Sequence, residues 1–244
     1  MAFQEGDIGS VLTVRLTKVA DSVISETQSA FIPGRLILDG AVIVHEVVHH
    51  LKSCKRSGII LKLDFEKAYD KVDWSFMKDV LRRKNFGEKW ISWMERVIEE
   101  GRVAINLNGE KAEYFRSYKG LRQGDPLSPM LFNLVGEGLA EILRTAREKG
   151  LVEDDTILFL KNSEDELSNF KLLLFCFEEM SGMRINYNKS EVYTLGVSVQ
   201  EGQAIADKLN CKLGKFPMKY LGVPISDRRS TMEQMIGVVE KVEK

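Results

Sequence analysis

The 244-residue sequence has little of what marks several common protein classes. Its three cysteines are odd in number, lie far apart and form no C-x-x-C pair, which fits a reducing compartment better than a disulfide framework. No apolar run approaches the roughly 20 residues that a membrane-spanning helix requires, and the polar, acidic start is unlike a targeting peptide. We therefore expect a soluble, intracellular protein of the nucleus or cytoplasm that makes no membrane contact.

A strong excess of either charge is also missing, because 35 Lys and Arg residues face 36 Asp and Glu residues. The chain as a whole should not attract a polyanion, so any nucleic-acid binding must come from local basic patches. Each candidate patch could equally be an ordinary solvated surface. The candidates are Lys52, Lys55 and Arg56; Arg82, Arg83 and Lys84; and Lys208, Lys212, Lys215 and Lys219.

What the sequence does have is 44% hydrophobic residues, enough to bury a core as one large domain or two lobes. Helical and extended patterns alternate along the chain, and Asn108-Gly109 is a strong hairpin signal. Pro33-Gly34 and Gly182 interrupt helical patterns, and Ser163 to Glu166 forms a capping box. The expected helices are 11–24, 37–51, 74–81, 89–98, 129–148 and 163–180, and the expected strands are 59–64, 103–107, 156–160, 193–195 and 220–223.

Acidic residues lie at the ends of two expected strands. Asp64 closes one apolar run, and Asp154 with Asp155 precedes another. If these strands are neighbours, the carboxylates converge and could hold two divalent cations about 3.5–4 Å apart, as nucleotidyl transfer requires. Oxygen ligands of this kind suit Mg²⁺. Taken alone, however, an Asp-Asp pair is more often a turn or a helix cap.

A competing pattern is the H-E-x-x-H sequence formed by His45, Glu46 and His49 on an expected helix. In zinc proteases this spacing places two imidazoles on one metal. A third ligand is also needed, and the remaining histidine, His50, points about 100° away on a helix of 3.6 residues per turn. A zinc protease is therefore a distant alternative.

Six segments in order resemble the motifs of LINE-type (non-LTR retrotransposon) reverse transcriptases, in particular those of plant genomes. The resemblance extends from about Leu12 to Ser226, which is nearly the whole chain. Both the order and the spacing of the segments match. They are QSAFIPGR (28–35), LKLDFEKAYD (61–70), GLRQGDPLSP (120–129), DDTILF (154–159), SGMRIN with KSE (181–186 and 189–191) and KYLGVP (219–224).

The resemblance implies an α+β fold built as the fingers and palm of a right-hand polymerase, with an antiparallel palm sheet backed by helices. It places fingers at 1–57 and 73–119, palm at 58–72 and 120–226, and a tail or the start of a thumb connection at 227–244. A thumb is expected to be absent. The implied activity is RNA-directed DNA polymerisation by two Mg²⁺ (or Mn²⁺) ions, with an RNA template, a DNA primer and dNTPs as partners. The oligomeric state stays unknown.

By the same resemblance, Asp64 and Asp154 bind the metal ions, Phe65 lends its backbone carbonyl, and Asp155 completes the catalytic acids. Tyr69 would be the ring beneath the incoming sugar, where it collides with a 2′-hydroxyl and selects deoxynucleotides. The other implied roles are nucleotide binding by Arg122, Gln123 and Gly124, contacts to triphosphate or template phosphates by Arg35 and Lys62, protonation of pyrophosphate by Lys189, and a primer grip at Tyr220, Leu221 and Gly222. For Arg35 and Lys62, a surface salt bridge is an equally good expectation.

One segment departs from the family pattern. The family has an aromatic-Ala dipeptide and a full strand before the two aspartates, whereas this chain has Val152-Glu153 and only a short stretch after the helix that ends near Glu148. We therefore expect a truncated catalytic hairpin. Because a misplacement of about 1 Å can cost two orders of magnitude in rate, a catalytically inactive retrotransposon remnant that at most binds nucleic acid is the main alternative.

Overall fold

The computed structural model describes residues 5–99, 102–103, 106–107, 110–111, 113–151, 159–160, 163–220 and 222–227. The chain forms two compact units, each assembled from three separate segments. We call them the helical unit and the sheet unit after their main elements. The helical unit comprises Met1–Gly34, Phe65–Leu143 and Leu173–Arg184, and the sheet unit comprises Arg35–Asp64, Arg144–Leu172 and Ile185–Lys244.

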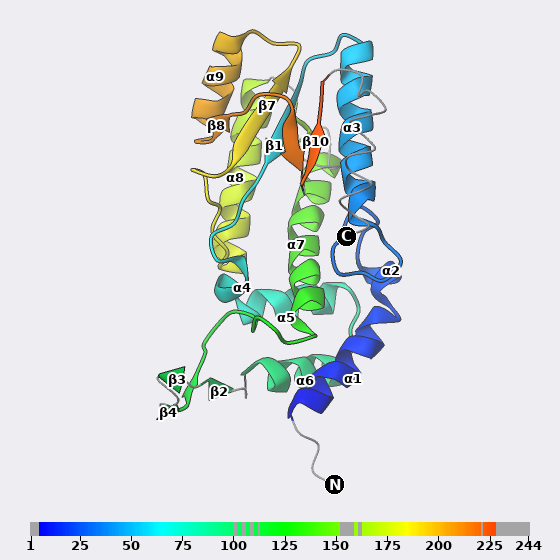
Figure 1. Ribbon diagram of the computed structural model, residues 1–244, viewed down its shortest axis with the longest axis vertical. Helices are drawn as coiled ribbons and strands as arrows, with labels where there is room; N and C mark the ends of the chain where they lie inside the picture. The colour runs from blue at the N-terminus through cyan, green and yellow to red at the C-terminus, as the bar shows by residue number, and fades with distance from the viewer. Residues whose placement is uncertain are drawn as a thin grey trace. The chain divides into compact units, whose positions relative to one another are not determined.

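Most of the helices belong to the helical unit (Figure 1). Two short antiparallel strand pairs complete it, and the pairing of Leu107 with Glu110 confirms a hairpin around the Asn108-Gly109 signal. The helices are α1 (Glu5–Thr17), α2 (Ala20–Val23), α4 (Ala68–Lys71), α5 (Trp74–Arg83), α6 (Glu88–Glu99), most of α7 (Ser128–Glu148) and the end of α8 (Glu164–Ser181); the strand pairs are β2 (Arg102–Val103) with β5 (Phe115–Arg116), and β3 (Asn106–Leu107) with β4 (Glu110–Lys111).

Helix α5 shows how the sequence builds this unit. The Asp73 carboxylate caps its start by accepting hydrogen bonds from the backbone N–H groups of Ser75 (2.8 Å) and Phe76 (3.0 Å). Its buried residues recur at helical spacing, so one face of the helix enters the core. That core is a single cluster that also takes in apolar side chains of α1, α6 and α7.

The sheet unit is built on a four-stranded sheet in the order β6-β1-β7-β8. The central strand β1 (Gly58–Lys62) pairs antiparallel with both β6 (Phe159–Leu160) and β7 (Glu191–Leu195), and β8 (Lys212–Leu213) pairs parallel with β7. A separate hairpin joins β9 (Met218–Tyr220) to β10 (Val223–Ile225). Every residue of β1 except Lys62 is buried, as its continuous apolar sequence predicts.

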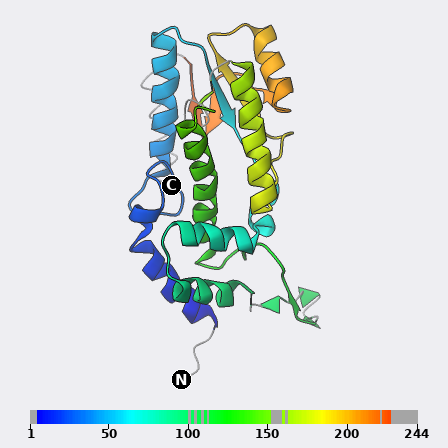
Figure 2. The same cartoon turned by 180° about the vertical axis from the view of Figure 1, so that it is seen from behind.

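Two layers cover this sheet. On one face, Ile60, Tyr193 and Leu195 pack against α3 (Ile37–Ser53) and the β9–β10 hairpin. On the other face, α9 (Val199–Lys208) approaches so closely that a Cβ on Gly202 would lie 3.0 Å from Oγ1 of Thr194. Figure 2 shows the N-terminal half of α8 along this second face, where Phe170 is fully buried. The sheet unit is therefore a sheet between helical layers.

The structure confirms the α+β class and most of the expected elements. The single helix expected at 11–24 is wrong: Val19 donates its N–H to Leu16, three residues back, and this tight turn separates α1 from α2. The strand expected at 220–223 is also wrong, because these residues span the turn between β9 and β10, where Gly222 has φ +87°. Helix α9 was not expected, although Ser198 and Glu201 form its capping box.

Among the described residues, no helix is both long and apolar enough to cross a membrane.

Candidate active site

Asp64, the first expected catalytic acid, follows β1 in the sheet unit and is held through its backbone. Its N–H donates to Oγ of Ser190 at 3.1 Å, and its carbonyl accepts from the N–H of Asn186 at 2.7 Å. Ser190 is fully buried and its hydroxyl also donates to the Asn186 carbonyl at 2.9 Å. The turn from Asn186 to Ser190 therefore fixes the end of β1, while the half-buried Asp64 carboxylate has no hydrogen-bond or ion-pair partner among the described residues.

Lys189 belongs to the same turn. Its side chain is exposed, and its N–H donates to the carbonyl of Asn186 at 3.0 Å. The turn thus brings the backbone of Lys189 and that of Asp64 into one local structure. The role of Lys189 toward pyrophosphate stays a prediction.

Lys62, two residues before Asp64, forms a salt bridge. Its ammonium lies 3.0 Å from Oε2 of Glu191, its partner on the neighbouring strand β7. Burial raises the pKa of Glu191, but hydrogen bonds from Lys62 and from the Tyr193 hydroxyl outweigh it and the pKa falls below its ordinary value. Of the two expectations for Lys62, this structure has the salt bridge. Arg35, the other phosphate candidate, is half-buried at the start of the sheet unit.

Tyr69, the expected sugar-sensing ring, lies on the short helix α4 of the helical unit. The ring stacks on Phe132 of α7, with centroids 4.8 Å apart and planes 11° from parallel. Burial raises the pKa of the Tyr69 hydroxyl, so the side chain is neutral in the physiological range. Phe65, the expected carbonyl ligand, packs its ring edge-on against Phe177. Both aromatic rings are thus anchored in the helical core.

The expected nucleotide-binding loop after Gly120 is joined to the α4 segment. Gly120 and Leu121 donate their N–H groups to the carbonyls of Val72 (2.8 Å) and Tyr69 (2.7 Å). The indole N–H of Trp74 donates to the Gly120 carbonyl at 2.7 Å. Gly120 has φ +88°, and a Cβ there would lie 2.7 Å from the Asp70 carbonyl oxygen, so the close approach requires glycine. The structure therefore brings Tyr69 and the loop together within the helical unit.

Arg122, Gln123 and Gly124 present polar groups from this loop. Gln123 and Gly124 are exposed, and Gly124 has φ +92° with open space around it. The Nη2 atom of Arg122 is buried, and no described residue accepts a hydrogen bond from it. Such a buried, charged donor is costly unless an acceptor is supplied. An anionic or carbonyl oxygen on a ligand would supply one.

The remaining acids, Asp154 and Asp155, lie outside the described residues, as does the segment in which we expect a truncated hairpin. Strand β6 begins shortly after them and pairs antiparallel with β1, with Ile60 opposite Phe159. No group of three metal-ligating side chains occurs in the part of the chain that the structure describes.

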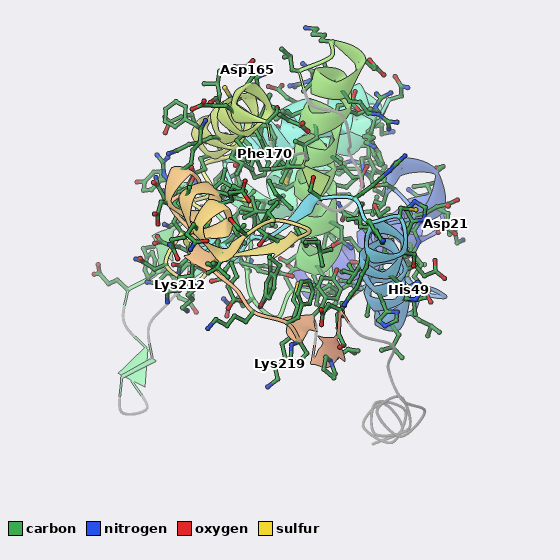
Figure 3. The ribbon with its side chains drawn as sticks, turned by 90° about the horizontal axis from the view of Figure 1, so that it is seen from above. Asp21, His49, Asp165, Phe170, Lys212 and Lys219 are labelled. Atoms are coloured by element: carbon green, nitrogen blue, oxygen red, sulfur yellow. The ribbon has the colours of Figure 1, made fainter. Side chains whose placement is uncertain are left out.

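The expected primer grip is the β9–β10 hairpin of the sheet unit. Tyr220 is half-buried against α3, where a Cβ on Gly40 would lie 3.3 Å from its hydroxyl oxygen, and burial raises the pKa of this hydroxyl. Leu221 lies outside the described residues. The neighbouring Lys219 is exposed on the hairpin and directed away from the sheet (Figure 3).

Comparison with known proteins decides the family. The family model described as reverse transcriptase (RNA-dependent DNA polymerase) matches residues 7–225. The chain belongs to the reverse transcriptase family. The match takes in every expected site residue.

Relatives and solved structures agree with this assignment. The chain is 27% identical over 245 residues to the transposon TX1 uncharacterized 149 kDa protein of Xenopus laevis, and 27% identical over 216 residues to the Pol polyprotein of the type-2 retrotransposable element R2DM of Drosophila melanogaster. These alignments cover 93% and 82% of this chain but only 18% and 20% of the relatives. This reverse transcriptase domain is therefore of the non-LTR retrotransposon kind, and its special likeness to plant elements stays a prediction.

Two structures of telomerase from Candida tropicalis share the fold. One, in complex with a fragment of telomeric RNA, matches 90% of this chain and 36% of its own with a TM-score of 0.57 and 16% sequence identity. The other, an apo form, matches 79% of this chain and 41% of its own with a TM-score of 0.55. The fold is thus that of right-hand polymerases.

The H-E-x-x-H pattern lies on α3, as expected, with His49 exposed on the helix surface (Figure 3). Its imidazole Nδ1 lies 3.4 Å from the hydroxyl of Ser53. Among the described residues, no third histidine, cysteine or carboxylate completes a metal site with this pair. Together with the family match, this removes the basis for a zinc protease.

Several residues that hold the candidate site residues had no predicted role. Ser190 and Asn186 hold Asp64, and Phe132 and Trp74 hold Tyr69 and the loop. Ser190 and Asn186 were visible as part of a motif, but nothing in the local pattern indicated which backbone group they would bind. Phe132 reads as an ordinary apolar position of a helix.

Proposed function

We propose that this chain copies an RNA template into DNA, adding dNTPs to a primer 3′ end with the help of two divalent cations. The relatives are much longer than this chain, so we propose this activity for the domain by itself. The main support for this activity is the buried Nη2 atom of Arg122, to which no described residue offers a hydrogen-bond acceptor. Arg122 belongs to the loop that is hydrogen-bonded to the Tyr69 segment. An incoming nucleotide would provide that acceptor.

The acidic part of the proposed centre rests on Asp64. Its carboxylate is an unpartnered oxygen donor among the described residues, on a backbone position held by Ser190 and Asn186. Hard oxygen ligands on a fixed backbone fit Mg²⁺ or Mn²⁺. When bound, the two ions would activate the attacking 3′ oxygen and stabilise the leaving pyrophosphate.

Strand direction supports Asp154 and Asp155 as the partners of Asp64. Ile60 pairs with Phe159 in an antiparallel ladder; Asp64 follows Ile60 by four residues and Asp155 precedes Phe159 by four. In antiparallel strands, residues after one strand and residues before its partner belong to the same end of the pair. We therefore propose that the three aspartates share that end, with the carbonyl of Phe65 as a further ligand.

The nucleotide part rests on Tyr69. A planar ring stacked on Phe132 is held rigidly, and a rigid ring excludes a 2′-hydroxyl more effectively than a mobile one. Arg122, Gln123 and Gly124 would contact the nucleotide, and Lys189 the pyrophosphate. Arg35 and Lys62 would contact phosphates, with Lys62 first released from Glu191. The hairpin at Tyr220, Leu221 and Gly222 would support the primer.

Primer extension tests the proposal directly. Residues 1–244 are incubated with a DNA primer on an RNA template, at low salt, with Mg²⁺ or Mn²⁺. We expect dNTP incorporation that Asp64→Asn abolishes, because the substitution replaces a charged carboxylate ligand by a neutral amide of the same shape. Asp79→Asn is the matched control, since Asp79 is an exposed carboxylate paired with Arg82 on α5, and it should retain activity.

Sugar selectivity provides the second readout. Tyr69→Ala should admit rNTPs, whereas Tyr69→Phe keeps the ring and should still exclude them. Equal incorporation by the unmodified protein and Asp64→Asn would contradict the proposal. No incorporation with either ion, in a protein that still binds RNA, would establish the inactive remnant instead.

A further inference from the structure

Phe31 combines two unusual properties. Its side chain is 64% exposed, although its neighbour Ile32 is 4% exposed and belongs to the core. Its backbone has φ +60°, in the left-handed region that bulky L residues rarely adopt. Asparagine or glycine would occupy this backbone conformation with less strain. The fold therefore gains nothing evident from a phenylalanine here.

The surrounding helical unit imposes this conformation on the loop. Asn133 of α7 donates its amide to the Ala30 carbonyl at 2.6 Å, immediately before Phe31. One turn further along α7, Glu137 accepts from the N–H of Ser25 at 2.9 Å and from its hydroxyl. Glu137 is itself anchored by Lys84 at 2.7 Å. The loop from Ser25 to Phe31 is thus tied to α7 at both ends.

Glycine at position 136 completes this attachment. A Cβ at Gly136 would lie 2.9 Å from the side-chain nitrogen of Gln28, so the loop lies directly on the α7 backbone. Asn133, Gly136 and Glu137 form one stripe of the helix, since residues three and four apart share a face. A rigid loop that displays a strained, exposed ring is the pattern expected of a binding residue.

We propose that the ring of Phe31 stacks on an unpaired base of the RNA template. The inference rests on the proposed function, which requires a single-stranded template next to the site of synthesis. A flat ring on a fixed backbone offers one stacking platform, and stacking accepts any base because every base has a π-face. Sequence-independent contact of this kind is what copying an arbitrary template demands.

Phe31→Asn separates binding from folding. If Phe31 binds RNA, asparagine relieves the left-handed strain, so the melting temperature stays equal or rises. The affinity for a short oligouridylate then falls by about 10-fold, the usual size of one stacking contact. If the residue serves the fold, the melting temperature falls. A lower melting temperature with unchanged RNA affinity overturns the proposal.

An abasic oligomer of the same length isolates stacking from charge. At low salt, the unmodified protein should bind oligouridylate more tightly than the abasic chain, and Phe31→Ala should erase that preference while Phe31→Trp keeps it. Phe175→Ala is the matched control, because Phe175 is 54% exposed but lies in the regular helix α8, and it should leave the preference intact.

These measurements need no polymerase activity, so they remain informative if the proposed function fails. Preference for the base-bearing oligomer without primer extension would leave Phe31 as an RNA-stacking residue in an inactive domain. An unchanged preference in Phe31→Ala, or a loss of self-association as its only effect, would show that the ring is covered by protein and would overturn the proposal.

Discussion

The two units hold their candidate site residues in different ways. In the helical unit, two backbone hydrogen bonds join the loop after Gly120 to the Tyr69 segment. The stack of Tyr69 on Phe132 and the hydrogen bond from the Trp74 indole to Gly120 hold the two partners further. In the sheet unit, the described contacts that hold Asp64 come from a single turn, through Ser190 and Asn186. The nucleotide part is therefore redundantly supported, whereas the acidic part depends on few contacts.

The ion pairs of the two units also differ, because the pair in the helical unit is more buried. Lys84 and Glu137 pair inside the helical unit, with side-chain exposures of 25% and 4%. Lys62 and Glu191 pair on the sheet, with exposures of 36% and 32%. Burial decides the value of such pairs, because an unpaired buried charge is costly while an exposed one is solvated. Substitutions at matched positions can therefore test the contrast.

The largest loss of stability is expected from Lys84→Met. It leaves the Glu137 carboxylate buried without its cation, which typically costs about 3 kcal/mol. Lys62→Met, the counterpart on the sheet, should cost less than about 1 kcal/mol because solvent screens that pair. Urea unfolding of both variants measures the difference, and equal losses would contradict the contrast.

Gly120→Ala should cause the next largest loss of stability. The added Cβ meets the Asp70 carbonyl at 2.7 Å and the backbone has φ +88°, so strain and displacement together should cost about 2–3 kcal/mol. Gly124→Ala has a similar φ, +92°, but open space, and should cost only about 1 kcal/mol. If the two variants melt at the same temperature, the close approach at Gly120 is not what holds the loop.

Ser190→Ala should affect activity more than stability. Loss of the hydroxyl leaves the Asp64 N–H without its acceptor, at a cost of about 1–2 kcal/mol, and loosens the acid. Ser181→Ala removes a similarly buried hydroxyl that accepts from Met183 in the helical unit. We expect similar unfolding free energies but a lower primer-extension rate only in Ser190→Ala. Equal rates would show that Ser190 does not position Asp64.

The smallest effect concerns alkaline stability of the sheet unit. Burial and then Glu191 raise the pKa of Tyr193 to about 12. Because its pKa in the unfolded chain is about 10, this tyrosine contributes stability that is fully present below pH 10 and is lost as pH rises toward 12. Tyr193→Phe should flatten the loss of stability between these pH values in denaturant titrations. An unchanged slope would remove Tyr193 as its source.

The sequence predicted what depends on local pattern. Apolar periodicity located α3, α5, α6, α7 and α8, and continuous apolarity located β1. It failed where geometry depends on a turn: α1 and α2 read as one helix, and the β9–β10 turn read as a strand. Helix α9 was not predicted, because it has few apolar positions and so no clear helical periodicity. Its capping box, Ser198 with Glu201, was present in the sequence.

For the candidate site, the motifs named the residues, whose roles stay predictions, but they did not indicate what holds those residues. The bond from the Asp64 N–H to Ser190 and the stack of Tyr69 on Phe132 join residues far apart in the chain. Local propensity carries no information on such pairs. The left-handed backbone of Phe31 is likewise imposed by α7 and could not be expected from its own sequence.

Iron-mediated cleavage tests most directly whether Asp64 and Asp154 bind the same ions. Fe²⁺ replaces Mg²⁺ at oxygen sites, and with ascorbate and peroxide it cuts the backbone close to where it is bound. If one centre is shared, cuts are expected near residue 64 and near residues 154–155, both suppressed by excess Mg²⁺ and both lost in Asp64→Asn. A cut near residues 154–155 that persists in Asp64→Asn would contradict a shared centre.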